Sequence, residues 1–185
     1  MTASTRYSLL TGTYELDSTH TRIGFVARHA MVTKVRGSFN EFAGTAWIDG
    51  DKPENSRVSV TIKAASIDTR NADRDGHLRS GDFLSLDEYP EVTFTSTGIR
   101  QSAEDTFDVT GDLTIRNVTK QVTIPFTFEG SAEDPFGNAR LGFEGATTIN
   151  RKDFGIIWNA ALEKGGVLVS DKVTLEFEVS AIKTA

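Results

Sequence analysis

Residues 121–130 (QVTIPFTFEG) and 172–182 (KVTLEFEVSAI) decide the fold of this chain, because apolar and polar residues alternate along both stretches. One side of the first stretch carries Val122, Ile124, Phe126 and Phe128. One side of the second stretch carries Val173, Leu175, Phe177 and Val179. Successive side chains of a β-strand point to opposite faces, so this period of two predicts strands with one apolar and one polar face.

Further alternating stretches lie at residues 21–30, 34–49, 57–65, 91–99, 107–116 and 139–149. Gly44 divides the second of these, where a glycine is typical of a turn or a bulge between two strands. The pattern predicts an all-β fold, an antiparallel up-and-down barrel of about eight strands with one or two short helices. A Greek-key sandwich stays open as an alternative, because alternation alone does not distinguish it from a barrel.

Two segments interrupt the alternation. Residues 69–89 are dense in charge and predict a short helix near residues 72–80, capped by Thr69 or Asn71 and ended by Gly81. The second interruption is the hexapeptide NRKDFG, which follows the stretch at 139–149.

No composition shift or linker divides the chain. We assign residues 1–12 to a flexible N-terminal arm and residues 13–185 to a single β-barrel domain, which is a normal length for one domain.

The composition argues against several functional classes. The chain has 185 residues and no cysteine, so thiolate catalysis, thiol redox chemistry and a cysteine-based zinc site are impossible. The net charge of −6 argues against broad nucleic-acid binding, which needs a basic face. No stretch approaches the ~20 apolar residues of a membrane span, and the first residues fall short of a secretory signal. We therefore expect a cytoplasmic protein with no transmembrane segment and no nucleic-acid partner.

The interior of such a barrel is either a packed core or a ligand cavity. Twelve Phe outnumber three Tyr and two Trp, which suits a deep apolar lining that needs few hydrogen bonds. An eight-stranded barrel either just fills with its own side chains or holds one small ligand. The alternation pattern leaves both possibilities open.

The candidate catalytic and metal-binding residues form no recognisable motif. His20, His29 and His77 are scattered and lack the close spacing of a helical zinc motif. No serine lies in a nucleophile elbow. We expect no catalytic residue, no cofactor and no metal. An enzyme or metal protein that uses these histidines near Asp17 is kept as an alternative.

Basic residues gather in the two interruptions. They are Arg70, Arg74, Arg79, Arg151 and Lys152. If both segments fold over one end of the barrel, these residues make a cationic rim suited to phosphate. In the competing interpretation the arginines pair with neighbouring acidic residues and hold the loops in place.

An ordered series of short motifs runs through the chain. In order, they are DSTH (17–20), IGF (23–25), GSF (37–39), SIDT (66–69), RDGHLRS (74–80), YPEVTF (89–94), GDLTI (111–115) and NRKDFG (150–155). Together they resemble the YceI-like family of polyisoprenoid-binding proteins. The resemblance implies a lipocalin-like barrel that holds a long isoprenoid chain, such as a polyprenyl phosphate or the tail of a quinone. Asn117 departs from the family, which often has Gly there.

The function that follows from this resemblance is non-enzymatic binding, storage or transport of an isoprenoid lipid. We expect the cavity to be lined by Phe25, Val60, Phe94, Leu113, Phe126 and Phe128. We expect the lipid head group to contact Arg74, His77, Arg79 and Arg151. A stress-response module with a solid core is a further alternative. Open sheet edges or a patch at the barrel mouth would support a homodimer, although no residue pattern demands one.

Overall fold

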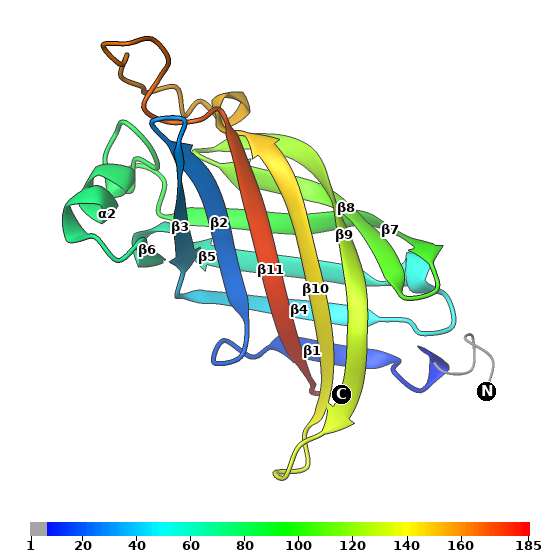
Figure 1. The fold of residues 1–185 in the computed structure, drawn as a ribbon. Coiled ribbons are helices and arrows are strands. Elements are labelled where there is room, and N and C mark those ends of the chain that lie inside the picture. Colours follow the sequence, from blue (N-terminus) through cyan, green and yellow to red (C-terminus); the bar gives the residue numbers. More distant parts are fainter. Residues whose placement is uncertain (1–6) are drawn as a thin grey trace.

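The computed structural model describes residues 7–185, and most of them lie in β-strands (Figure 1). The strands are β1 (Gly12–Leu16), β2 (Arg22–His29), β3 (Thr33–Phe39), β4 (Phe42–Ile48), β5 (Arg57–Lys63), β6 (Ile67–Asp68), β7 (Glu91–Ala103), β8 (Thr106–Ile115), β9 (Val118–Glu133), β10 (Ala139–Asn150) and β11 (Lys172–Lys183). The helical elements are α2 (Ala72–Arg79) and the 3-10 helices η1 (Pro53–Asn55), η2 (Ala64–Ser66) and η3 (Arg151–Phe154).

Eight of these strands close into a barrel. Their order around the wall is β1-β4-β5-β7-β8-β9-β10-β11, and β11 pairs back with β1. Each of these pairings is antiparallel, and a closed ring leaves none of the eight strands at an open edge. The predicted antiparallel barrel is confirmed, and the sandwich alternative is excluded.

The first strands of the barrel are interrupted halfway along their length. One half of β11 pairs with β1, where Leu16 lies opposite Ala181, and the other half pairs with β2, where Ile23 lies opposite Phe177. β1 and β2 are therefore two halves of one long strand. β3 and β4 continue each other in the same way, since β3 pairs with β2 and β4 pairs with β1. With these halves joined, the chain runs up and down around the barrel.

The interruption between β3 and β4 lies at Asn40 and Glu41. The prediction that Gly44 marks it was wrong. Gly44 lies inside β4, where a Cβ atom would come within 2.7 Å of Cδ1 of Leu16. A glycine at position 44 is thus explained by the close packing of a neighbouring side chain and not by a turn.

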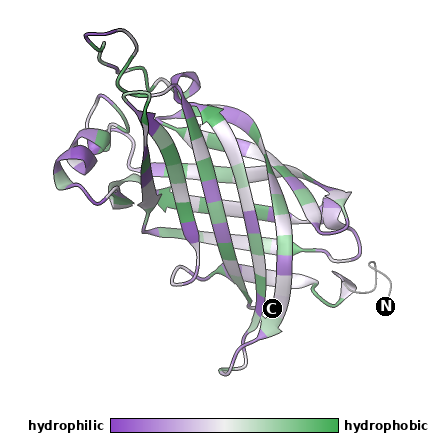
Figure 2. Cartoon of the chain, in the orientation of Figure 1, coloured by the Kyte–Doolittle hydropathy of each residue, from purple (hydrophilic) through white to green (hydrophobic). Residues whose placement is uncertain are grey.

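The alternation read from the sequence sets which side chains face the interior. In β9, Ile124 and Phe128 are buried, whereas Thr123 and Thr127 are exposed. Apolar and polar bands alternate along the front strands of the barrel (Figure 2). Pro125 lies where the β9–β10 ladder stops, since the last paired residues are Gly145 and Phe126. A proline lacks the N–H that a further ladder bond would need.

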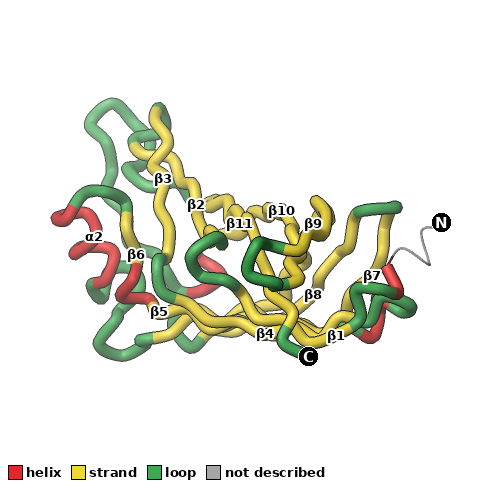
Figure 3. Tube along the Cα trace, turned by 90° about the horizontal axis from the view of Figure 1, so that it is seen from below, coloured by secondary structure: helices red, strands yellow, loops and turns green. Residues whose placement is uncertain are grey.

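The predicted short helix is α2, at one end of the barrel beside β3 and β6 (Figure 3). Asn71 is its N-cap, because its side-chain oxygen accepts a hydrogen bond from the backbone N–H of Arg74 at 3.0 Å. Ser80, in an extended conformation, ends the helix, so the expected stop at Gly81 comes one residue late.

The N-terminal segment closes the opposite end. The predicted flexible arm covered residues 1–12, of which 1–6 lie outside the described part of the chain. Tyr7 packs against the barrel and is therefore not part of a loose arm. It is 5% exposed, and its ring packs edge-on against Phe107 and Phe128. Its hydroxyl donates to the carbonyl oxygen of Glu104 at 2.6 Å and also contacts the Asp105 carboxylate.

An ion network on the outside of the barrel joins three segments. The Arg140 guanidinium donates to Asp17 Oδ2 at 2.6 Å and to Asp134 Oδ2 at 2.7 Å. The Asp17 carboxylate also accepts hydrogen bonds from Thr19 and pairs with His20. Hydrogen bonds from Arg140 first, and then from Thr19 and His20, hold the pKa of Asp17 well below its usual range.

The second carboxylate of this network is Asp134, in the β9–β10 turn. The backbone N–H of Asn138, together with Arg140, holds the pKa of Asp134 low as well. Arg140 therefore ties both the β1–β2 interruption and the β9–β10 turn to the barrel wall.

Replacing Arg140 with Met should destabilise the protein in a pH-dependent way. The pKa values of both carboxyl groups are lower in the folded than in the unfolded chain. Their stabilisation is therefore complete above the ordinary Asp pKa of about 3.9 and is lost as the pH falls through the folded values. In urea titrations, the deficit of R140M relative to the wild type should be largest at pH 7 and should shrink below about pH 4.

Arg100→Met is the matched control, because the Arg100 side chain is 80% exposed and its ion pair within residues 7–185 is with Asp108 alone. It should change the free energy of unfolding little at any pH. A deficit of R140M that is constant from pH 7 to pH 2 would contradict the assignment.

Candidate functional site

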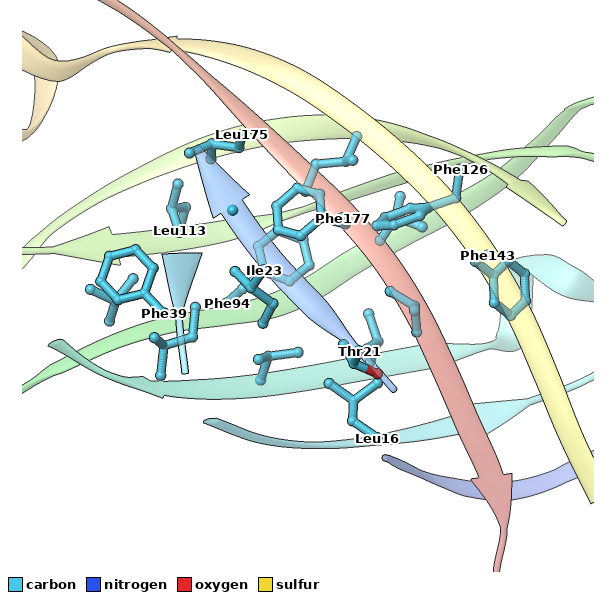
Figure 4. Close-up of a pocket in the computed structure, with 18 of the residues that line it drawn as sticks. Leu16, Thr21, Ile23, Phe39, Phe94, Leu113, Phe126, Phe143, Leu175 and Phe177 are labelled. Atoms are coloured by element: carbon cyan, nitrogen blue, oxygen red, sulfur yellow. The ribbon is translucent and has the colours of Figure 1, made fainter. Parts of the chain in front are cut away.

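The barrel encloses a cavity of about 350 Å³ whose lining includes residues from both ends of the barrel. Figure 4 shows the side chains that line part of it. Its lining is almost entirely apolar. One end is bounded by Tyr7 and Leu10, and the other by Phe154, Ile156 and Val169. The strands supply this lining because alternate residues of each strand face inward.

All six apolar residues predicted for the cavity face it. They are Phe25 on β2, Val60 on β5, Phe94 on β7, Leu113 on β8, and Phe126 and Phe128 on β9. The lining residues left out of the prediction include Phe39, Phe143, Leu175 and Phe177. Leu175 and Phe177 lie on the apolar side of the alternating stretch at 172–182, so the pattern that places β11 also points to them.

Several inward-facing side chains keep part of their surface accessible. Phe25, Phe126 and Phe177 pack against the buried core but are only partly buried themselves. Their neighbours within the barrel are other rings, at 5.9 Å between Phe25 and Phe39 and 5.8 Å between Phe126 and Phe177. Inward-facing side chains are only partly buried where they border unfilled space, which disfavours the solid-core alternative.

Glycines on the inner face let the aromatic rings lie against the wall. Gly37 is paired with Phe25, and Gly145 with Phe126, on neighbouring strands. A Cβ atom would lie 2.3 Å from Cζ of Phe25 if built at position 37, and 2.6 Å from Cδ1 of Phe126 at position 145. Any larger residue at either position would push the ring toward the barrel axis. These glycines are functional candidates that the sequence prediction did not include.

Two of the predicted head-group residues hold the loop around α2. Arg74 donates to Oγ1 and to the carbonyl oxygen of Thr69, both at 2.7 Å. Arg79 donates to the carbonyl oxygens of Ala65 and Ile67, both at 3.0 Å. Neither lines the cavity. Their acceptors are mostly backbone carbonyls and not the neighbouring acidic side chains that the competing interpretation expected.

His77 lies on α2 outside the cavity lining. Its Nε2 atom is 2.9 Å from Asp82 Oδ2, and its ring meets the rings of Phe83 and Trp158 edge-on, with centroids 5.0 and 4.6 Å away. The ring thus joins α2 to the loop at residues 155–171.

Arg151 is the predicted polar residue that reaches the cavity, at its α2 end. The side chain is 4% exposed, and burial lowers the pKa of its guanidinium. Nη1 donates to the carbonyl oxygens of Ile156 at 2.7 Å and Trp158 at 2.9 Å, and Nε donates to that of Ser170 at 2.8 Å. Arg151 therefore holds both arms of the loop at residues 155–171 across this end of the barrel.

The structure does not bring the three histidines together. His20 pairs with Asp17 and His77 pairs with Asp82, whereas His29 ends β2 opposite Val169. Within residues 7–185, no three His, Asp or Glu side chains come close enough to hold a metal ion in common. No helix in the described part of the chain is long and apolar enough to cross a bilayer.

The sequence profile of the YceI-like domain matches residues 14–181. The chain belongs to the YceI-like family. Among its relatives, a UPF0312 protein of Pseudomonas putida (strain W619) is 40% identical over 172 residues, which cover 92% of this chain and 86% of that protein. A UPF0312 protein of Azotobacter vinelandii is 44% identical over 137 residues, or 74% of this chain and 71% of that protein.

Several solved structures share the fold. The Campylobacter jejuni YCEI protein has a TM-score of 0.74 and 30% identity, and the match covers 85% of this chain and 90% of that one. BcnA of Burkholderia cenocepacia has a TM-score of 0.78 and 24% identity, with coverage of 89% and 98%. A polyisoprenoid binding domain from Saccharophagus degradans has a TM-score of 0.70 and 16% identity, with coverage of 92% and 98%. The last two likenesses show the lipocalin-like fold alone.

A comparison of two phenylalanines tests whether the barrel is hollow. Phe154 bounds one end of the cavity but is only 1% exposed, so its ring is packed on nearly every side and Phe154→Ala should lower the free energy of unfolding by about 3–5 kcal/mol. Phe126→Ala should cost less, because one side of the ring already borders the cavity. Both values come from urea denaturation, and equal losses would argue for a solid interior.

Gly145→Ala should lower the free energy of unfolding by about 1–3 kcal/mol, because the new Cβ atom collides with the Phe126 ring. Gly142→Ala, three residues away on the same strand, is the control, since its Cβ atom would find its nearest neighbour at 3.7 Å. Thermal melts of the two variants give the comparison. A stable G145A protein would mean that the ring has room to move.

Proposed function

We propose that this protein binds a long isoprenoid lipid, a polyprenyl phosphate or an isoprenoid quinone, inside the barrel and stores or transports it without changing it chemically. The observation that carries this proposal is the continuous apolar cavity along the barrel. A ligand that fits it is long, slender and apolar for most of its length.

The energetics of burial favour such a ligand. Each buried methylene-sized group contributes about 0.8 kcal/mol, so one isoprene unit contributes a few kcal/mol before the costs of association. A cavity of about 350 Å³ falls within the size range of small-molecule sites. Several units in the cavity offset the loss of translational freedom and chain entropy. Affinity then comes from the apolar chain.

The lining offers few hydrogen-bond partners to a polar head group. We therefore propose that the chain lies against Phe25, Val60, Phe94, Leu113, Phe126 and Phe128 and that the head group lies at an end of the barrel. Arg74, Arg79 and Arg151 donate mainly to backbone carbonyls. In this proposal they and His77 shape the end of the barrel near the head group by holding its loops.

The domain of Saccharophagus degradans that shares this fold is described as polyisoprenoid binding, which supports the ligand class by analogy. A cytoplasmic location and a homodimer stay predictions from the sequence. The metal-dependent alternative loses its basis, because its three histidines lie in separate places.

Native mass spectrometry of freshly purified protein tests the proposal. A bound apolar mass should be present and should be lost from the variant Val60→Trp, whose side chain fills the cavity. Added polyprenyl phosphate should bind V60W at least about tenfold more weakly than it binds the wild type, since blocking one isoprene unit removes a few kcal/mol of burial.

Ser59→Trp is the matched control, because Ser59 is the preceding residue on β5 and is exposed on the outer face. It should bind lipid as the wild type does. Failure of the wild-type protein to bind polyprenyl phosphate or an isoprenoid quinone would refute the proposal.

A further inference from the structure

We propose that the β2–β3 end of the barrel docks on an anionic lipid surface. The docking element is the apolar tip, which we define as Met31, Val32 and Val167. This inference goes beyond isoprenoid binding, because it concerns a surface of the molecule and not the occupant of its cavity.

The apolar tip is exposed, whereas most large apolar side chains of residues 7–185 are buried or partly buried. Met31 is 61% exposed, Val32 75% and Val167 40%. Ile157, which is 69% exposed, lies in the loop that holds Val167, just after η3 at the same end of the barrel. A cluster of exposed apolar residues on one end of a protein marks a surface for a partner or a membrane.

Two segments far apart in the sequence build this tip. The backbone N–H of Ala30 donates to the carbonyl oxygen of Leu168 at 2.8 Å, and His29 lies opposite Val169. Gly166 is so close to Met31 that a Cβ atom there would lie 2.4 Å from Sδ. The β2–β3 turn and the loop at residues 155–171 project together beyond the strands (Figure 1). A projecting tip suits insertion into a soft surface better than docking against a flat protein face.

The turn that presents Met31 is conformationally costly. The backbone N–H of Val32 donates to the carbonyl oxygen of His29 at 3.1 Å, and the two central residues, Ala30 and Met31, have φ angles of 49° and 66°. Asn-Gly is the usual pair in such a turn, because a bulky residue with positive φ is strained. Met31 gains little burial within the chain in return, which points to a contact outside it.

The charge around the tip is opposite to that of the whole protein. The chain carries −6, yet residues 18–40 contain four basic residues and no Asp or Glu. The loop at residues 155–171, which supplies Val167, holds one Lys, one Glu and one Asp, so the two segments together carry +3. Arg28 and Lys34 lie opposite each other on β2 and β3, directly behind the turn, and both are exposed. Arg22 and Arg36 lie farther from the turn, near Glu176. Long basic side chains beside an apolar tip fit a surface of anionic lipid, whose phosphates they reach while the tip enters the acyl region.

A second copy of this chain fits the tip less well. A symmetric contact between two tips would bring Arg28 and Lys34 of each copy toward the same basic residues of the other, and like charges repel.

Docking on a membrane also accounts for the position of the tip beside the cavity. Ala27 and Val169, which neighbour it in the chain, line the cavity. Docking through the tip therefore brings this end of the cavity to a bilayer.

Co-sedimentation with vesicles that contain no isoprenoid tests the inference separately from the proposed function. The wild-type protein should pellet with phosphatidylglycerol–phosphatidylethanolamine vesicles at low salt and much less with phosphatidylcholine vesicles. The double variant Met31→Ser/Val32→Ser should bind the anionic vesicles at least about tenfold more weakly, since most of the inserted apolar surface is lost. Arg28→Gln/Lys34→Gln should weaken binding and remove most of its dependence on salt.

Phe136→Ser is the matched control. Phe136 is 88% exposed and lies in the β9–β10 turn at the opposite end of the barrel, so its replacement should leave vesicle binding unchanged. Met31→Gly guards against misfolding, because glycine accepts the positive φ. It should melt no lower than the wild type and still bind vesicles more weakly.

Three results would overturn the inference. One is a wild-type protein that stays in the supernatant with anionic vesicles at low salt. Another is vesicle binding by M31S/V32S that equals that of the wild type. The third is a wild-type protein that does not bind vesicles but whose molar mass in light scattering falls in M31S/V32S, which would make the tip an interface between copies of this chain.

Discussion

The hydrogen bonds of β11 are the constraint on which the rest of this structure depends. On one side β11 pairs with β10 along its whole length, from Lys172 to Ile182. On the other side it pairs with β2 and then with β1, so that the last strand of the chain meets the first. Without this double pairing the sheet would have two long open edges and an uncovered apolar face. Closure satisfies the backbone and turns the apolar face into an interior.

The closed sheet stays hollow because of what faces inward. A barrel of this size has an interior that side chains alone are able to fill. Here the inner glycines Gly37, Gly111 and Gly145 are each covered by a ring from a neighbouring strand, and a fourth inner glycine, Gly44, is covered by Leu16. The rings of Phe25, Phe94 and Phe126 lie over the first three glycines, against the wall. The space that a second layer of side chains would occupy is left as the cavity.

Sequence patterns predict those parts of this molecule that depend on interactions between residues close together in the sequence. The strands at 121–130 and 172–182, their inward faces and the Asn71 cap depend on near neighbours, so periodicity and capping rules find them. The burial of Tyr7 and the joining of β1 with β2 along β11 depend on contacts between distant residues. The hydrogen-bond partners of Arg74, Arg79 and Arg151 could not be predicted from the sequence, because most of them are backbone carbonyls. Every residue has a backbone carbonyl, so the residue types give no sign of which ones accept these bonds. The three histidines lie apart for a related reason, since nothing in their local sequence says where the barrel places each of them.

The two ends of the cavity are closed by different kinds of segment. At the Tyr7 end, residues 7–11 run directly into β1, where the Thr13 N–H donates to the carbonyl oxygen of Ala185 at 2.9 Å, and the Tyr7 hydroxyl anchors the segment to Glu104. At the α2 end, the closing segment is a long loop. Arg151 donates three hydrogen bonds to its backbone carbonyls, and a short backbone bridge at Leu168 and Val169 joins its far arm to the end of β2. A long loop with few backbone ladder bonds opens at lower free energy than paired strands do. Under the proposed function, we therefore expect a ligand to enter through the α2 end, where the exposed apolar residues and the basic β2–β3 hairpin also lie.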